Sequence, residues 1–193
     1  MLSSKESLKV LRKTNALLEG HFVLSSGLHS DRYIQCAKLL SFPKLSQKIC
    51  HSLSRRIKKK FKSIDLILSP AVGGIVIGYE IGKILNKETI FCERVNKKFT
   101  LRRGFEIKKN SKVLIVEDVI TTGKSSLECV KLIKKSKARL VGFACLIDRS
   151  KNKKLRNKII SQVKLEIPTF NKKNLPLSLK KIPITKPGSR FLK

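Results

Sequence analysis

The sequence has little aromatic content and no tryptophan: aromatic residues make up 6% of its 193 residues. Stacking platforms for single-stranded nucleic acids are therefore scarce. An uninterrupted apolar run of about 20 residues, which a membrane-spanning helix requires, is also missing. The uncharged stretch from Leu66 to Tyr79 is broken by Pro70 and by the pair Gly73-Gly74. Because the charged N-terminus lacks the apolar segment of a signal peptide, we expect a cytoplasmic protein without a membrane segment.

Cysteine and histidine do not occur in metal-binding or disulfide patterns. The five cysteines are an odd number with no C-x-x-C pair, and the three histidines form no H-E-x-x-H motif. These absences argue against a disulfide framework and against a zinc site. We therefore expect free thiols in a reducing compartment.

Acidic residues are few, 13 against 44 basic residues, which gives a formal net charge of +31. One interpretation is a nucleic-acid-binding surface, because such a field concentrates polyanions near the protein. The other is compositional drift, since lysines outnumber arginines by 33 to 11 and are scattered along the chain. We favour drift, because no nucleic-acid-binding motif accompanies the charge. A nucleic-acid partner is therefore not expected.

The length and the apolar share of 41% predict a single domain with a substantial core. Ser3 and Glu6 form a capping-box pattern, which predicts a helix to about Leu18. A short strand is expected at Tyr33-Ile34, and a second helix begins at Pro43. Strands are predicted over 65–68, 89–92, 113–116 and 140–147, a weaker strand over 163–167, and helices over 73–86 and 123–137.

These later strands are apolar throughout and are joined by helices. Such strands indicate an α/β fold with a parallel sheet that is covered on both faces. Ligands of such sheets bind beyond the carboxyl ends of the strands. The segment from Arg94 to Ser111 is long, polar and cationic, and we expect it to be too poor in apolar residues to pack on its own sheet.

The most informative stretch is VLIVEDVITTGKSS, which begins at Val113. Its Gly123-Lys124-Ser125 resembles the end of a phosphate-binding P-loop, but that motif needs a glycine where Asp118 stands. Two carboxylates after a buried strand suit a neutral vicinal diol, because ionised carboxylates accept hydrogen bonds. The hydroxyl and N–H groups from Thr121 to Ser125, at a helix N-terminus, suit a phosphate monoester. Together these groups predict a site for a ribose 5-phosphate.

A structural interpretation competes with this one. Glu117 and Asp118 would begin a loop, while Thr122 or Ser125 would cap a helix. Capping accounts for one hydroxyl, but it accounts neither for the acidic pair after a buried strand nor for the whole run. We therefore favour the ribose-phosphate site.

The run resembles the phosphoribosyl diphosphate signature of the type I phosphoribosyltransferases. Three further segments resemble the orotate phosphoribosyltransferase family: the hood FVLSSGLHSDRYI from Phe22, the turn SPAVGG from Ser69, and LIDR, which ends at Arg149. Glu93-Arg94 resembles the start of the family's mobile catalytic loop. The matches run in family order from Gly20 to Arg149.

The resemblance implies a type I phosphoribosyltransferase fold, with a core over about 60–150 and a small hood from about 1–40 and 150–193. It implies transfer of ribose 5-phosphate from 5-phosphoribosyl 1-diphosphate to orotate in pyrimidine (UMP) biosynthesis. It implies Mg²⁺ held through substrate and water without direct protein ligands, and a homodimer with shared active sites. It also implies these site residues: Arg94, Lys98 and Asp118 in catalysis; Glu117, Asp118, Val119, Ile120, Thr121, Thr122, Gly123, Lys124 and Ser125 for phosphoribosyl diphosphate; Ala71, Val72 and Gly73 for the diphosphate; and Thr121, Arg149 and Ser25 for orotate.

The sequence departs from the family pattern at two positions. Ser25 stands where many members carry a lysine, and the segment from Val95 to Arg103 has no histidine where many members carry one. Lys97, Lys98 or one of the arginines at 102 and 103 would then supply the positive charge. Two alternatives remain: a phosphoribosyltransferase for another base, and an RNA-binding regulator of the same fold that has lost catalysis.

Overall fold

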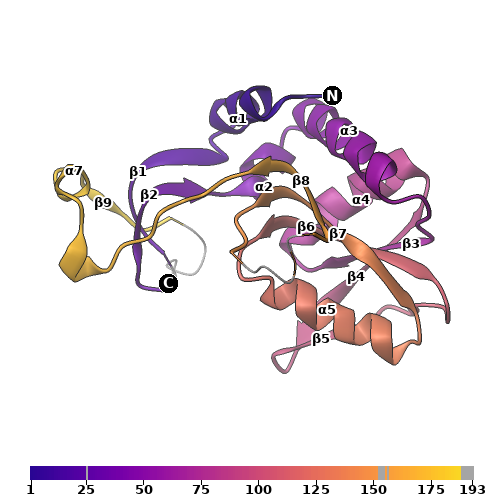
Figure 1. The fold of residues 1–193 in the computed structure, drawn as a ribbon. Coiled ribbons are helices and arrows are strands. Elements are labelled where there is room, and N and C mark those ends of the chain that lie inside the picture. Colours follow the sequence, from indigo (N-terminus) through magenta and orange to yellow (C-terminus); the bar gives the residue numbers. More distant parts are fainter. Residues whose placement is uncertain (25, 152–154, 156, 188–193) are drawn as a thin grey trace.

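The computed structural model describes residues 1–24, 26–151, 155 and 157–187, and it contains two sheets (Figure 1). The larger sheet has six strands in the order β5-β4-β3-β6-β7-β8. All of its neighbours pair in parallel except β4 and β5. The predicted α/β class with a mainly parallel sheet is confirmed. The strands are β3 (Leu66–Pro70), β4 (Glu88–Val95), β5 (Lys98–Leu101), β6 (Lys112–Ile120), β7 (Arg139–Asp148) and β8 (Ile159–Lys164).

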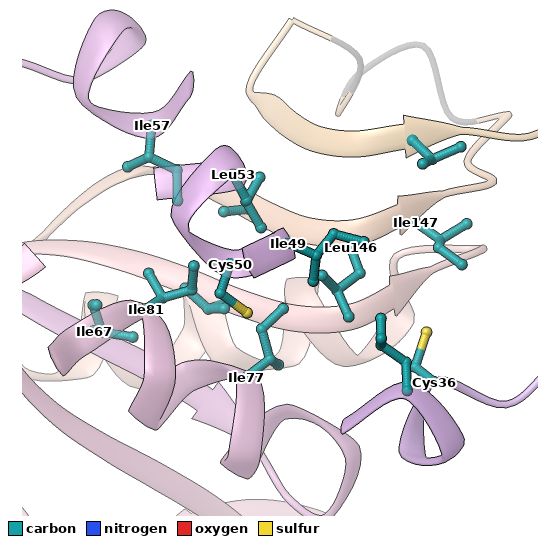
Figure 2. Close-up of a cluster of buried hydrophobic side chains, with 14 of the residues drawn as sticks. Cys36, Ile49, Cys50, Leu53, Ile57, Ile67, Ile77, Ile81, Leu146 and Ile147 are labelled. Atoms are coloured by element: carbon teal, nitrogen blue, oxygen red, sulfur yellow. The ribbon is translucent and has the colours of Figure 1, made fainter. Parts of the chain in front are cut away.

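Helices cover both faces of this sheet (Figure 1). One face carries α3 (Pro43–Lys60) and α4 (Gly73–Leu85), and the other carries α5 (Lys124–Lys135). Figure 2 shows how α3 and α4 meet the sheet through a cluster of buried aliphatic side chains. Each fully buried Leu or Ile contributes about 1.5–3 kcal/mol, so this layer is a main source of stability. Its members include Ile49, Leu53, Ile57, Ile67, Ile77, Ile81 and Leu146.

The smaller sheet joins an N-terminal and a C-terminal segment of the sequence, and we refer to it as the hood. Strand β1 (Leu17–Val23) pairs antiparallel with β2 (His29–Ile34) and parallel with β9 (Ile184–Thr185). The chain reaches β9 through the 3₁₀ helix η1 (Lys172–Asn174) and the short helix α7 (Leu177–Lys180).

Two buried histidines lie inside this hood. His21 Nε2 lies 2.6 Å from His29 Nδ1, and His21 Nδ1 lies 3.2 Å from the carbonyl oxygen of Ile182. A carbonyl oxygen only accepts, so His21 donates from Nδ1 and accepts from His29 at Nε2. These two hydrogen bonds connect β1 and β2 to the segment that holds Ile182.

The predicted N-terminal helix is shorter than expected. The capping box at Ser3 and Glu6 is confirmed, but α1 (Ser4–Lys13) ends well before Leu18. Asn15 adopts a left-handed conformation with φ 53°, which turns the chain out of the helix. Leu18 then lies in β1, where pairing with β2 prevails over helix propensity.

The expectation that the polar segment from Arg94 to Ser111 cannot pack on its own sheet is wrong. β4 extends to Val95, and β5 returns antiparallel to it as a hairpin, with Arg94 opposite Phe99. Phe99 and Ile107 are buried against the sheet. Together with the partly buried Leu101 and Phe105, these side chains anchor the segment on the sheet.

The remaining boundaries differ in smaller ways. A helix that was not predicted, α2 (Cys36–Leu40), precedes α3, and the weak strand expected over 163–167 is β8, which starts earlier at Ile159.

On α5, Ile133 and Cys129 face the core, whereas Leu127 is 43% exposed. All five cysteines are free and buried, as expected. Within the part of the chain that the structure describes, no helix is both long and apolar enough to cross a membrane.

Candidate active site

The predicted site residues gather at the carboxyl ends of three neighbouring parallel strands. β3 ends at Pro70, β6 at Ile120 and β7 at Asp148, and β6 pairs with both of the others. The turn after β3 hydrogen-bonds to the fourth strand, since the Ala71 N–H donates to the carbonyl of Cys92 in β4 at 2.8 Å. One edge of the larger sheet therefore carries the turn after β3, the acidic pair and the residues that follow β7, whereas the hood motif lies in the smaller sheet.

The acidic pair lies inside β6, which continues past it to Ile120, rather than after the strand. Successive strand residues point to opposite faces, and the pair follows this rule. Glu117 points toward α5, where Ser126 donates a hydrogen bond to its Oε1. Asp118 points toward the start of α4, and its Oδ1 accepts from the Val119 N–H at 2.8 Å. The two carboxylates are adjacent in sequence but do not share a face of the sheet.

Burial changes the proton affinity of both carboxyl groups. It raises the pKa of Glu117 to about 7, and the charge of Asp118 adds to this effect while the Ser126 hydrogen bond opposes it. Burial also raises the pKa of Asp118, against the hydrogen bond from the Val119 N–H. Raised pKa values of this kind are common where a site is built to bind or react.

The turn after β3 touches Asp118 at a glycine. A Cβ atom at Gly73 would lie 2.9 Å from both carboxylate oxygens of Asp118, closer than real Cβ atoms approach. Gly73 is also the first residue of α4. The turn from Ala71 to Gly73 and the acidic strand are thus brought together, and only glycine permits this separation.

The segment after β6 forms the start of α5. Gly123 has a left-handed conformation with φ 75°, and a Cβ atom there would overlap the side chain of Leu155. The Lys124 N–H donates to Thr122 Oγ1 at 3.3 Å. The N-cap of α5 is Gly123, which has no side chain, so the expected capping by Thr122 or Ser125 is wrong. Thr121 and Lys124 are exposed at the same edge.

A cavity of about 320 Å³ opens beside this segment. Thr121 and Thr122 line one side of it, and Arg149 follows directly after β7. The Arg149 N–H donates to the carbonyl of Ile120 at 2.8 Å, which fixes the arginine beside the end of β6. Its Nε is buried without a hydrogen-bond partner, and burial lowers the pKa of the guanidinium. A half-buried cation thus faces a cavity of suitable size for a small anionic ring.

Sequence reasoning missed the far wall of this cavity. Lys164, Glu166 and Thr169 line it, together with Lys151. No local motif marks the first three of these residues, because their segment reaches the site only through the pairing of β8 with β7. The weak strand predicted over 163–167 was the one available signal.

In the hairpin of β4 and β5, Arg94 contacts other groups of the protein. Arg94 Nη1 lies 2.8 Å from Glu128 Oε2 on α5 and donates to the carbonyl of Lys97 at 2.7 Å. Its guanidinium also lies 4.1 Å from the centre of the Phe99 ring. Lys98 is exposed at the start of β5, opposite Val95. The structure therefore brings Arg94 to the edge of the site but holds it against α5.

A second ion pair fixes the opposite side of the hairpin. Arg103 donates to both carboxylate oxygens of Glu93, at 3.1 and 3.2 Å.

Ser25, expected at the orotate site, lies outside the described residues. Among the residues that are described, no group of three or more His, Cys, Asp or Glu side chains is arranged to hold a metal ion.

Comparison with known proteins decides the family. Residues 36–181 match the phosphoribosyl transferase domain family. The chain is 42% identical over 191 residues to the orotate phosphoribosyltransferase of Erythrobacter litoralis, which covers 98% of this chain and 99% of that protein. The chain belongs to the orotate phosphoribosyltransferase family. It is therefore a member of the type I phosphoribosyltransferases, as the sequence motifs indicated.

Solved structures agree with this membership. The orotate phosphoribosyltransferase of Aeropyrum pernix superposes with a TM-score of 0.72 at 25% identity, over 81% of this chain and 92% of that one. The orotate phosphoribosyltransferase of Mycobacterium tuberculosis, in complex with inorganic phosphate, gives a TM-score of 0.66 at 20% identity, over 83% and 94%. The latter identity is low enough that the likeness supports the phosphoribosyltransferase fold alone.

Proposed function

We propose that this protein transfers ribose 5-phosphate from 5-phosphoribosyl 1-diphosphate to N1 of orotate, giving orotidine 5′-monophosphate and diphosphate. The observation that carries the proposal is the cavity in which Arg149 and Thr121 meet, beside the acidic strand and the helix start. The sequence identity of 42% to a relative named orotate phosphoribosyltransferase, which extends over nearly the whole chain, supports this proposal.

The phosphoribosyl end of the substrate would lie along β6 and the start of α5. The 5′-phosphate would accept hydrogen bonds from the segment Thr121 to Ser125, where the positive end of the helix favours an anion. Asp118 would accept hydrogen bonds from the ribose diol, with Glu117 supporting it from the opposite face. The diphosphate would then lie against the turn Ala71 to Gly73, which touches Asp118.

Breaking the bond from C1 to the diphosphate leaves positive charge on the sugar and negative charge on the leaving group. Cations directed at that leaving group stabilise the charge as it develops, which is usually the largest catalytic contribution. Arg94 and Lys98 are the candidates for this role. Arg94 must leave Glu128 to reach the diphosphate, so the hairpin would close over the substrate and exclude water.

The residues present suit Mg²⁺ that is held mainly through substrate and water. Carboxylates are the oxygen ligands that Mg²⁺ prefers, but those of Glu117 and Asp118 already accept hydrogen bonds from Ser126 and from the Val119 N–H. Bound with the diphosphate, Mg²⁺ would neutralise part of its charge.

We further propose that the protein is a homodimer. An exposed apolar stripe on one side of α4 supports self-association: Val72 is 82% exposed, Val76 51% and Tyr79 66%, at helical spacings of four and three residues. The family resemblance implies that the hairpin of one subunit serves the active site of the other.

The decisive experiment is an assay with the purified protein. Orotate absorbance should fall only when 5-phosphoribosyl 1-diphosphate and Mg²⁺ are both present. Adenine and uracil serve as competing bases in matched reactions. A protein that consumes one of them and leaves orotate untouched would overturn the proposal.

The role of Arg149 gives a sharper prediction. Arg149→Ala should raise the KM for orotate by about ten- to a hundredfold, because a charged hydrogen bond contributes about 1.5–3 kcal/mol. The KM for phosphoribosyl diphosphate should change much less. Steady-state kinetics with each substrate varied in turn would measure both values, and equal effects would indicate a structural role for Arg149.

A further inference from the structure

The cavity beside β7 holds a cation that none of the sequence motifs includes. Lys164 is the last residue of β8, and the parallel register of β7 and β8 sets it opposite Asp148. The pairing continues one residue further, since the Leu165 N–H donates to the carbonyl of Asp148 at 2.9 Å. This register brings Lys164 to the same end of the sheet as Arg149, and both residues line the one cavity.

The carboxylates around the cavity do not neutralise Lys164. Asp148, opposite it, is buried, and its Oδ1 accepts a hydrogen bond from the Ser150 N–H at 2.8 Å. Among the described residues, none of the ion pairs in the structure includes Lys164. Of the residues that the structure describes, three basic and two acidic ones line the cavity, and none of them bonds to the buried Nε of Arg149. The cavity therefore presents several cations to whatever occupies it, among them Arg149 after β7 and Lys164 at the end of β8.

We propose that Lys164 is a specificity-determining residue that binds the carboxylate of the pyrimidine together with Arg149. The inference rests on the proposed function and assigns a second cation to the base site. A base that carries a carboxylate would contact both walls, whereas the same ring without that group would leave both cations without an anion. Lys164 would thus separate orotate from uracil, and orotidine 5′-monophosphate from uridine 5′-monophosphate, by charge.

The test compares two nucleotides that differ only in that carboxylate. Calorimetry on the full chain would measure the Kd of orotidine 5′-monophosphate and of uridine 5′-monophosphate. Lys164→Met keeps an unbranched side chain of similar size and removes its charge. We expect its Kd for orotidine 5′-monophosphate to rise about tenfold, at the lower end of the range for charged hydrogen bonds because Lys164 is exposed. The Kd for uridine 5′-monophosphate should not change.

Two control variants accompany this experiment. Lys164→Arg keeps the charge and should keep the tight binding of orotidine 5′-monophosphate. Lys131→Met removes a charge from an exposed site on α5 that lies outside the cavity lining, and it should change neither Kd.

An unchanged Kd for orotidine 5′-monophosphate in Lys164→Met would overturn the inference, as would an equal loss for both nucleotides, which indicates a structural role. The proposed function fails in a different way. In that case the wild-type protein would neither prefer orotidine 5′-monophosphate nor consume orotate, and the inference would fall with it.

Discussion

At the scale of single residues, the backbone of Gly73 and the carboxylate of Asp118 lie so close together that they limit which residue can stand at position 73. The turn after β3 and the acidic residue of β6 come from motifs more than 40 positions apart in the sequence. Their separation leaves no room for a Cβ atom. The sequence predicted both motifs, but it could not predict that they touch, because contact depends on the order of β3 and β6 in the sheet.

Asp118→Asn tests the role of this carboxylate. The amide is nearly the same size, so the fold should be retained, but it removes the negative charge that accepts hydrogen bonds from the diol. We expect turnover to fall by about a hundredfold or more, on the scale of losing a preorganised polar group at the reacting centre. Circular dichroism would confirm folding, and steady-state assays would measure the rate. Full activity in a folded variant would remove the ribose-binding assignment.

At the scale of elements, the hairpin of β4 and β5 is where sequence reasoning failed. The helices were predictable because apolar residues such as Ile49, Leu53 and Ile57 repeat at helical spacing. The central strands were predictable because they are apolar throughout. The hairpin segment has few apolar residues, and it packs because Phe99 and Ile107 reach the core, with Leu101 and Phe105 partly buried beside them. Only tertiary packing decides such a case, so local pattern could not have revealed it.

The ion pair between Arg94 and Glu128 links this hairpin to α5. If Arg94 must release Glu128 to meet the diphosphate, Glu128→Gln should strengthen the binding of inorganic diphosphate with Mg²⁺. The pair is partly exposed, and such pairs contribute about 0–1 kcal/mol, so we expect a decrease in Kd of about fivefold at most. Calorimetry would measure this change.

The same measurement on Arg94→Ala, alone and combined with Glu128→Gln, supplies the control. Without Arg94, the Glu128 substitution should have no effect on diphosphate binding, since its partner is gone. Weaker binding in the single variant Glu128→Gln would mean that Glu128 orients Arg94 for the diphosphate instead of holding it away.

At the scale of the whole molecule, the buried His29 of the hood makes stability depend on pH. Burial lowers the pKa of His29, and the charges of His21 and Lys172 act in the same direction. The unfolded chain therefore takes up a proton at a higher pH than the folded chain does. The free energy of unfolding should fall as the pH drops below about 6.5, the usual pKa of histidine.

Glu117 acts in the opposite direction over the same range. Its pKa is raised to about 7, so the folded chain binds its proton first and gains stability as the pH falls. The prediction is therefore a difference between variants. His29→Gln should lose less stability than the wild type between about pH 7.5 and 5.5 in urea denaturation. His51→Gln, at an exposed site on α3, should behave as the wild type does. If the stability of His29→Gln changed with pH as that of the wild type does, the proposed role of His29 would be contradicted.

The proposed shared active sites can be tested by mixing two inactive proteins. One carries Arg94→Ala and Lys98→Ala, and the other carries Asp118→Asn. If each hairpin serves the partner's site, a mixed dimer has both lesions in one site and leaves the other intact. Activity should then reappear after subunit exchange, up to about a quarter of the wild-type value for random pairing. No recovery despite demonstrated exchange would mean that each hairpin closes over its own subunit's site.

The parallel pairing of β1 with β9 sets an order of events during biosynthesis. β1 is made early, but its partner at Ile184–Thr185 is made about 160 residues later, so the hood cannot close until β9 has left the ribosome. The six-stranded sheet needs nothing beyond Lys164 and can assemble before then. A nascent chain paused beyond that point would hold a folded core and an unfinished hood. The smaller sheet is thus completed after the larger one, because it pairs strands that are made far apart in time.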